Sequence, residues 1–136
     1  MDAVEGRRRF GEARTARLAT VRPDGAPHIV PIVFALEGER IFTVVDEKPK
    51  RTRDLQRLTN IRTEPRVSVL VDHYGEDWRE LWWVRADGPA RIARDGAELG
   101  RAVELIERKY PQERDRPPAG PAILIDVERW RFWPSD

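Results

Sequence analysis

The sequence predicts a mainly β protein of the α+β class, in which six or seven short antiparallel strands form a small barrel with two or three flanking helices. Three observations lead to this prediction. Short apolar runs, several of them alternating with polar residues, recur along the whole chain. Turn-forming segments at 23–25 and 37–39 separate successive runs, because Pro and Gly favour the backbone of tight turns. Apolar residues at helical spacing are confined to a few stretches. We therefore expect a single domain over 1–136.

The first half of the chain contains one expected helix and three expected strands. Residues 4–14 are predicted as a helix with a modest apolar side. Residues 16–22 alternate apolar and polar side chains, which predicts a short strand. The longest apolar run, over 26–36, is predicted as one strand, and residues 41–45 as the next.

The second half contains further short strands and two helices. Gly88 and Pro89 suggest a bulge or bend between two strands. Asp95 with Glu98 three residues later is a capping-box pattern, which predicts the start of a long helix. The expected elements are a helix over 52–63, strands over 67–72, 81–87 and 90–93, a helix over 95–110, a proline-rich loop over 111–121 and a last strand over 123–127.

Composition and charge exclude several classes of protein. The absence of cysteine excludes a disulfide scaffold, a thiolate metal site and thiol catalysis, and it agrees with a reducing cytoplasm. Two histidines are too few for a histidine-built site, so we expect no metal. The formal net charge is +1, from 25 basic and 24 acidic side chains, which argues against nucleic acid as a partner. No apolar run approaches the roughly 20 residues that cross a bilayer, and no apolar signal segment follows the charged N-terminus. We therefore expect a cytoplasmic protein without membrane contact.

A cationic turn follows the strand expected at 41–45. Lys48, Lys50 and Arg51 lie within four positions, directly before Thr52, a residue type suited to the helix N-cap. A helix start offers unpaired backbone N–H groups and the positive end of the helix dipole, so adjacent cations there favour binding of a phosphate or carboxylate. Many proteins hold a redox or nucleotide cofactor by its phosphate. The alternative interpretation is a solvated basic turn.

The order and spacing of several segments resemble the split β-barrel flavin and deazaflavin proteins related to pyridoxamine 5′-phosphate oxidase. The resemblance is greatest to their actinobacterial branch, which uses the deazaflavin coenzyme F420. The segments that carry it are 16–21, 24–28, 42–43, 48–55, 65–71 and 82–90. The resemblance implies the FMN-binding split-barrel fold and a cofactor that lies across the interface of a homodimer.

The resemblance also implies which residues hold the cofactor. In relatives the turn after the third strand grips the phosphate, and the strand before it lies along the ring. The implied cofactor-binding residues are His28, Pro31, Ile32, Val33, Thr43, Val44, Lys48, Lys50, Arg51, Thr52, Trp83 and Trp130. Arg51 can donate a forked pair of N–H groups to phosphate oxygens, whereas each lysine acts as a point charge. His28 can hydrogen-bond the carbonyl edge of the ring. The alternative for His28 and the tryptophans is ordinary packing within the barrel.

We therefore expect an oxidoreductase that binds reduced F420 and transfers hydride to a small conjugated acceptor. The cofactor does the chemistry in such a protein, so no side chain is expected to be a catalytic group. Two alternatives remain. One is an FMN-dependent oxidase or reductase of the same fold, whose phosphate would use the same cationic turn. The other is a non-catalytic protein that binds the cofactor without turnover.

Overall fold

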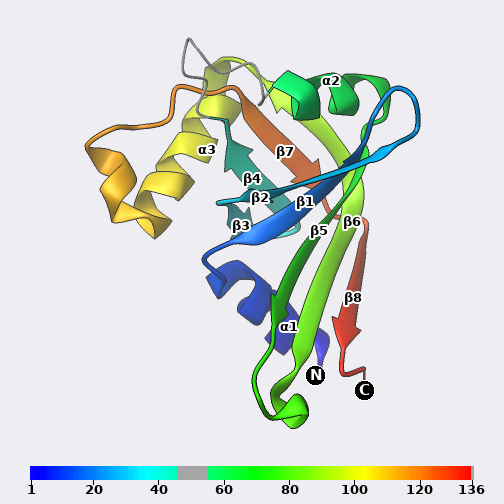
Figure 1. Ribbon diagram of the computed structural model, residues 1–136. Coiled ribbons are helices and arrows are strands. Elements are labelled where there is room, and N and C mark those ends of the chain that lie inside the picture. The colour runs from blue at the N-terminus through cyan, green and yellow to red at the C-terminus, as the bar shows by residue number, and fades with distance from the viewer. Residues whose placement is uncertain (46–54, 136) are drawn as a thin grey trace.

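The computed structural model of the chain describes residues 1–45 and 55–135. These residues form the expected mainly β, antiparallel split barrel, with three α-helices around it (Figure 1). The elements are α1 (Ala3–Glu12), β1 (Ala16–Val21), β2 (Pro27–Ile32), β3 (Ala35–Glu37), β4 (Arg40–Val44), α2 (Leu55–Thr63), β5 (Arg66–His73), the short 3₁₀ helix η1 (Trp78–Glu80), β6 (Trp82–Ala93), α3 (Gly96–Lys109), the short 3₁₀ helix η2 (Pro111–Arg114), β7 (Ala122–Asp126) and β8 (Arg129–Trp133).

One path of hydrogen-bonded strands curls into the barrel. Its order is β2-β1-β5-β6-β7-β4-β3, each neighbouring pair is antiparallel, and β8 pairs with β6 beside the path. The described residues thus contain seven strands along the path and an eighth outside it. β2 and β3 lie at the two ends of the path. Just after β2, the carbonyl oxygen of Val33 accepts a hydrogen bond from the Thr43 hydroxyl of β4 (2.8 Å). A side chain therefore joins the residue after β2 to β4, the strand beside β3, and we call this junction the seam of the barrel.

The apolar run over 26–36 forms two strands, so its prediction as one strand was wrong. β2 ends at Ile32 and β3 begins at Ala35, because β2 pairs with β1 whereas β3 pairs with β4 at the opposite end of the path. Between the two strands, the backbone N–H of Phe34 donates to the Tyr110 hydroxyl (3.3 Å), which satisfies it outside any strand ladder. The hydrophobic pattern does not mark this change of partner, because the side chains on both sides of it are buried.

β6 is one continuous strand where the sequence predicted two strands on either side of Gly88. Pairing with β5 runs through this glycine without a break. What changes there is the partner on the other edge of β6: residues 83–87 pair with β8, and residues 90–93 pair with β7. A Cβ atom on Gly88 would lie 2.0 Å from the carbonyl oxygen of Asp126. Glycine therefore lets the chain that leaves β7 pass directly against β6.

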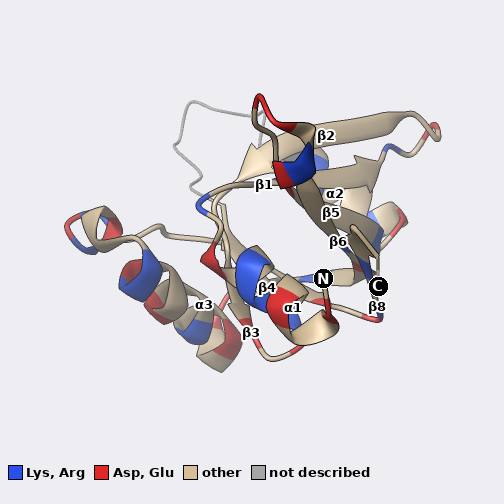
Figure 2. Ribbon diagram, turned by 90° about the horizontal axis from the view of Figure 1, so that it is seen from below, with Lys and Arg blue, Asp and Glu red and all other residues tan. Residues whose placement is uncertain are grey.

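The helices carry interleaved acidic and basic residues on their exposed sides, as Figure 2 shows for α1 and α3. α1 begins at Asp2, whose carboxylate accepts a hydrogen bond from the backbone N–H of Glu5 (2.8 Å). Asp95 is the N-cap of α3, but its side chain makes no capping hydrogen bond. The predicted capping box was therefore wrong in its contacts, because the Glu98 carboxylate pairs with Arg91 of β6 instead.

The hydrophobic core is divided between the barrel interior and the space under α3. In the interior, the ring of Phe10 of α1 packs edge-on against the rings of Phe34 and Trp130, each at a centroid distance of 5.1 Å. The second part lies between α3 and the strands β4 and β7, whose side chains are almost all buried on both faces. In the described ranges, no helix combines the length and the apolar character needed to cross a membrane.

Candidate functional site

The predicted phosphate-binding set lies outside the described residues. It consists of Lys48, Lys50, Arg51 and Thr52, within the segment 46–54. The elements on both sides of that segment are described: β4 precedes it and α2 follows it. The candidate site is therefore built from the residues of β2, β4 and α2, and the role of the cationic turn stays a prediction.

Strand β2 has one inward and one outward face, as its alternation predicted. Ile32 points into the core at 5% exposure, and His28 on the same face is half-buried. Ile29 is 63% exposed and Pro31 is exposed on the other face, and Val33, just beyond the strand, is 39% exposed. The predicted ring contacts thus share one strand but divide between its two faces. The outward face is a row of exposed apolar residues at the end of the sheet path, where a proline without an N–H is tolerated.

His28 has a buried ring nitrogen that is unpaired among the described residues. Its Nδ1 atom is buried and makes no hydrogen bond to any described residue. Buried polar atoms are nearly always paired, so this nitrogen makes His28 a candidate for a hydrogen bond to a bound molecule. Burial lowers the pKa of His28, and the positive charges of Arg22 and Arg57 lower it further. The imidazole is therefore neutral at pH 7 and has one donor and one acceptor nitrogen.

A buried polar chain lies beside His28 and connects α2 to β1. Gln56 donates from Nε2 to Asn60 Oδ1 (2.7 Å), and Asn60 donates from Nδ2 to the hydroxyl of Thr20 (2.9 Å). Thr20 is the register partner of His28 across β1 and β2. Asn60 is completely buried, so this chain fixes α2 against the strands that carry His28. The sequence analysis missed Asn60. A polar residue four positions after Gln56 and between the buried Leu58 and Ile61 was the available signal.

The two predicted contacts on β4 are both buried. Thr43 is 2% exposed and its hydroxyl already bonds the carbonyl of Val33, so it holds the seam of the barrel together. Val44 is 9% exposed and is the last residue of β4. Both side chains pack within β4, the strand that precedes the cationic turn in the sequence. Whether either touches a cofactor stays a prediction.

The two predicted tryptophans are not brought to His28 within one protomer. Trp83 lies on β6, and β1 and β5 separate β6 from β2. Trp130 of β8 donates from its indole N–H to Glu39 (2.8 Å), and the guanidinium of Arg7 lies 5.6 Å from the centre of its ring.

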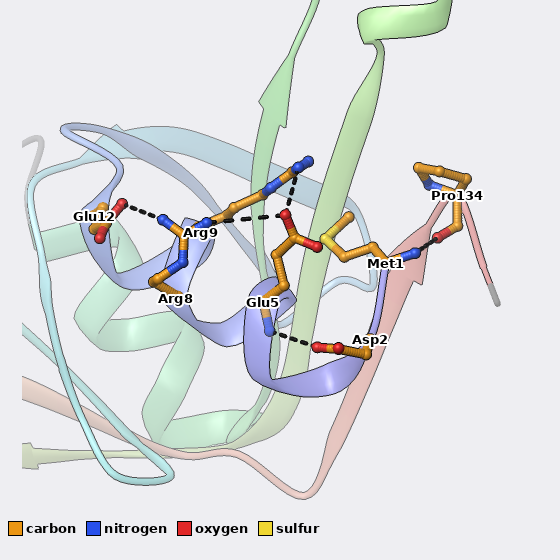
Figure 3. A network of polar contacts seen from close by, with 7 residues as sticks. All are labelled: Met1, Asp2, Glu5, Arg8, Arg9, Glu12 and Pro134. Carbon is orange, nitrogen blue, oxygen red and sulfur yellow. Dashed lines mark hydrogen bonds and ion pairs between the residues drawn. The ribbon is translucent and has the colours of Figure 1, made fainter.

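A hollow of about 530 Å³ lies between α1, the β5–β6 connection and the two ends of the chain. The amino group of Met1 donates to the carbonyl of Pro134 (3.3 Å), and Arg9 pairs with Glu5 (2.7 Å), as Figure 3 shows. The guanidinium of Arg9 also lies 5.3 Å from the centre of the Trp82 ring. The polar groups around the hollow pair with one another, so we interpret the hollow as a packing contact between α1 and the end of β8. Among the described residues, no group of three or more His, Asp or Glu side chains could hold a metal ion.

The third lysine of the sequence, Lys109, lies at the end of α3 with its amine buried. Its Nζ atom lies 3.9 Å from the centre of the Phe34 ring and has no hydrogen-bond partner in the described part of the chain. Burial lowers the pKa of Lys109 to about 8, and the charge of Arg14 adds to this effect. The Tyr110 hydroxyl beside it accepts from the N–H of Phe34 and donates to the carbonyl of Arg14 (2.9 Å). Lys109 thus packs at the contact between the end of α3 and Phe34, the residue between β2 and β3.

Replacement of Lys109 by methionine is expected to remove a pH dependence of stability. The folded pKa of about 8 lies below the unfolded value of 10.5, so between these values the unfolded chain binds a proton that the folded chain does not. The stability of the parent protein should therefore rise from pH 7.5 to 9.5. Burial raises the pKa of Tyr110, so this window stays below the pH at which the folded Tyr110 loses its proton. Thermal unfolding across this window measures the rise. The rise should be absent in Lys109→Met and present in Arg108→Met, a surface control one position away. An equal rise in Lys109→Met and the parent would contradict the prediction.

Comparison with known proteins places this geometry in a family. A family model described as pyridoxamine 5′-phosphate oxidase matches residues 5–134. None of the curated proteins matches the chain. The family match spans β2, β4, α2 and the cationic turn between them, so it includes every element of the candidate site.

Solved structures resemble the whole chain. The conserved hypothetical protein Rv2991 from Mycobacterium tuberculosis is 27% identical, with a TM-score of 0.79, and the match covers 98% of this chain and 84% of that one. A FAD-binding protein from Mesorhizobium loti is 22% identical with a TM-score of 0.73, covering 97% and 94%. The heme storage protein HutZ from Vibrio cholerae is 16% identical with a TM-score of 0.74, covering 98% and 94%. At these identities, the last two show a likeness of fold.

Proposed function

Because the chain belongs to the pyridoxamine 5′-phosphate oxidase family, we propose that it is an oxidoreductase that holds a phosphorylated flavin-type cofactor between β2 and the cationic turn. The observation that carries the proposal is the Nδ1 atom of His28, which is buried and has no hydrogen-bond partner within residues 1–45 and 55–135. This atom lies on the strand along which the resemblance places the cofactor ring. A neutral imidazole fits the carbonyl and N–H edge of a flavin or deazaflavin, because it can donate or accept one hydrogen bond there.

The specific cofactor that we propose is coenzyme F420, in its reduced form, with FMN as the alternative. The density of cations in 48–51 suits a cofactor with several anionic groups. The FAD-binding neighbour favours the flavin alternative. When bound, either cofactor would supply the redox chemistry, which for F420 is hydride transfer to a small conjugated acceptor.

The residues of the chain would bind and orient the cofactor and exclude water from it. His28 would fix one edge of the ring, and the chain from Gln56 through Asn60 to Thr20 would hold the strand beneath it. The cations of the turn would bind the phosphate. The apolar wall of β2 would exclude water from one side of the ring.

A second copy of the chain would complete the site. Ile29 and Val33 expose large apolar side chains on the outward face of β2, and Trp133 of β8 is 47% exposed. Exposed apolar rows on a sheet edge favour association. A homodimer would cover this row and bring the tryptophans of one copy to the cofactor of the other. We expect size-exclusion chromatography with light scattering to give a dimer mass.

A paired titration tests the cofactor. The purified protein is titrated with F420 and with FMN, and cofactor fluorescence is followed at low and high salt. Salt-sensitive binding of F420 alone, at micromolar or lower concentration, would support the proposal. Preference for FMN would support the flavin alternative. Heme enters the same experiment as a third ligand, because a heme storage protein shares the fold. Binding of heme alone, without F420 or FMN, would overturn the proposal in favour of a heme-binding protein.

Replacement of His28 by phenylalanine is expected to weaken cofactor binding about tenfold, the effect of losing one hydrogen bond to a buried partner. Phenylalanine keeps the ring volume at this half-buried position and removes both nitrogens. The matched control is His73→Phe, since His73 is the other histidine and its exposed ring stacks on Trp82. Fluorescence titration of both variants provides the measurement. Equal affinities in the two variants would mean that His28 is an ordinary barrel residue.

A further inference from the structure

The outer face of the sheet formed by β5, β6 and β8 carries a cluster of charged residues away from the candidate cofactor site. Strand register places Ser68 of β5, Asp87 of β6 and Arg129 of β8 in one row. Arg85 lies two residues before Asp87 and therefore projects from the same face. A hollow of about 560 Å³ opens over this row.

Asp87 is the centre of the cluster. Its carboxylate accepts hydrogen bonds from the hydroxyl of Ser68 (2.7 Å) and from Nε of Arg85 (3.1 Å), and Nε of Arg129 lies 3.6 Å from it. Burial by itself would raise the pKa of Asp87. The hydrogen bonds from Ser68 and Arg85 and the charges of both arginines outweigh burial and hold the pKa below its usual value. Asp87 is therefore an anion in the neutral pH range, and one carboxylate fixes two guanidinium groups.

The arginines meet Asp87 through Nε, which leaves their outer edges available. Within the described ranges, the terminal nitrogens of Arg85 and Arg129 donate no hydrogen bond. The side chains of these arginines are 39% and 59% exposed, whereas that of Asp87 is 19% exposed. The carboxylate is thus less exposed than the two cations, and all three groups line the hollow. Planar, oriented N–H groups of this kind match the geometry of a carboxylate or phosphate.

The local charge favours an anion of low charge. Arg85 and Arg129 together exceed Asp87 by one positive charge. Arg66, which also lines the hollow, is already paired with Glu64. Glu128 lines the hollow with an exposed carboxylate that forms no ion pair among the described residues. Its negative charge would oppose an anion at the rim and so limit the affinity.

We propose that this hollow is a binding site for the oxyanion group of a small molecule, held by the terminal N–H groups of Arg85 and Arg129. Asp87 and Ser68 are positioning residues, because Asp87 holds the two guanidinium groups at Nε and Ser68 holds the Asp87 carboxylate. The site goes beyond the proposed function: it lies on β5, β6 and β8, and the cofactor contacts predicted on these strands, Trp83 and Trp130, are not among its residues. It does not depend on which cofactor binds there, or on whether any does.

Titration with inorganic phosphate and with succinate tests the site and separates phosphate from carboxylate ligands. The full chain is used with Lys50→Ala and Arg51→Ala present, which removes the phosphate site predicted in the turn. Ionic strength is held constant with chloride, and backbone amide signals are followed by NMR. We expect saturable shifts at Ser68, Asp87 and Arg129 with at least one of the two anions.

Variants of the cluster locate the binding. Arg85→Gln and Arg129→Gln should each weaken binding about tenfold, the effect of losing a charge-assisted contact at a partly exposed site. Glu128→Gln should strengthen it, since the opposing charge is gone. Arg131→Gln is the matched control, because Arg131 lies on the same strand and face as Arg129 but outside the hollow. Because Arg131 is the register partner of Arg85, its removal lowers the local positive potential, and the loss of affinity should be smaller than in either of the other two arginine variants.

Three results would overturn the proposal. One is the absence of saturable shifts with either anion. Another is an equal loss of affinity in Arg131→Gln and Arg129→Gln, which would indicate general attraction to a basic face. The third is a change in the mass of the assembly in Arg129→Gln at unchanged anion affinity, which would make the cluster a contact between copies of the chain. The first two results do not bear on the fluorescence titration of the cofactor, so the anion site can fail while the proposed function stands.

Discussion

Replacement of both Lys50 and Arg51 by alanine is expected to weaken binding of the cofactor by about 3–6 kcal/mol, because each charge-assisted hydrogen bond to a phosphate contributes about 1.5–3 kcal/mol. This corresponds to a loss of at least a hundredfold in affinity. The variant should also lose most of the salt dependence of binding, since the cations that attract the phosphate are gone. Fluorescence titration with F420 and with FMN, at low and high salt, measures both effects.

The control for this double variant is Arg62→Ala. Arg62 lies on α2, near the turn in sequence, and is exposed at the far end of the helix. It tests whether any arginine near the site attracts an anionic cofactor, and its removal should leave affinity within about twofold of the parent, as expected for a screened surface charge. Circular dichroism establishes that each variant is folded. Unchanged affinity in a folded double variant would mean that the turn is a solvated one and would remove the phosphate-binding argument.

The sequence predicted the class of fold because its signals are local. Alternation of apolar and polar residues and the turns at 23–25 and 37–39 need no knowledge of distant partners. The same alternation correctly placed His28 and Ile32 on one face of β2 and Pro31 on the other. A period-two pattern fixes which side chains share a face, and burial of one face then fixes the direction of each.

The parts that the sequence did not predict depend on pairing between distant segments. The break between β2 and β3 exists because the two strands lie at opposite ends of the sheet path and pair with different strands. No residue near Val33 signals this change of partner. The cluster at Asp87 exists because strand register brings two distant residues to it. Ser68 lies 19 residues earlier on β5, and Arg129 lies on β8. Asn60 reads as a surface residue until α2 is placed against β1. Hydrophobic periodicity contains none of this information.

Replacement of Gly88 by alanine is expected to destabilise the fold by about 3 kcal/mol or more, the upper range for overpacking in a closely packed site. The added Cβ would lie 2.0 Å from the carbonyl oxygen of Asp126 and 3.2 Å from the backbone nitrogen of Glu128. Both contacts are with backbone, and this backbone cannot withdraw freely, because the N–H of Glu128 donates to the carbonyl of Asp87 (2.9 Å). The chain would have to move away from β6 at the point where β6 changes from β8 to β7. The predicted fall in the unfolding temperature is about 10 °C.

Two other glycines make the test specific to this crossing. Gly100→Ala on the exposed side of α3 meets nothing within 4 Å and should stabilise the protein by about 0.5–1 kcal/mol, because alanine favours the helix. Gly6→Ala on α1 would approach the ring of Phe132, a side chain that can turn aside, so its cost should lie between the other two. Thermal and denaturant unfolding of the three variants should give this order. If Gly88→Ala were as stable as Gly100→Ala, the chain between β7 and β8 would have to pass β6 at a greater distance. The close crossing that joins the two halves of the sheet would then not be a requirement of the fold.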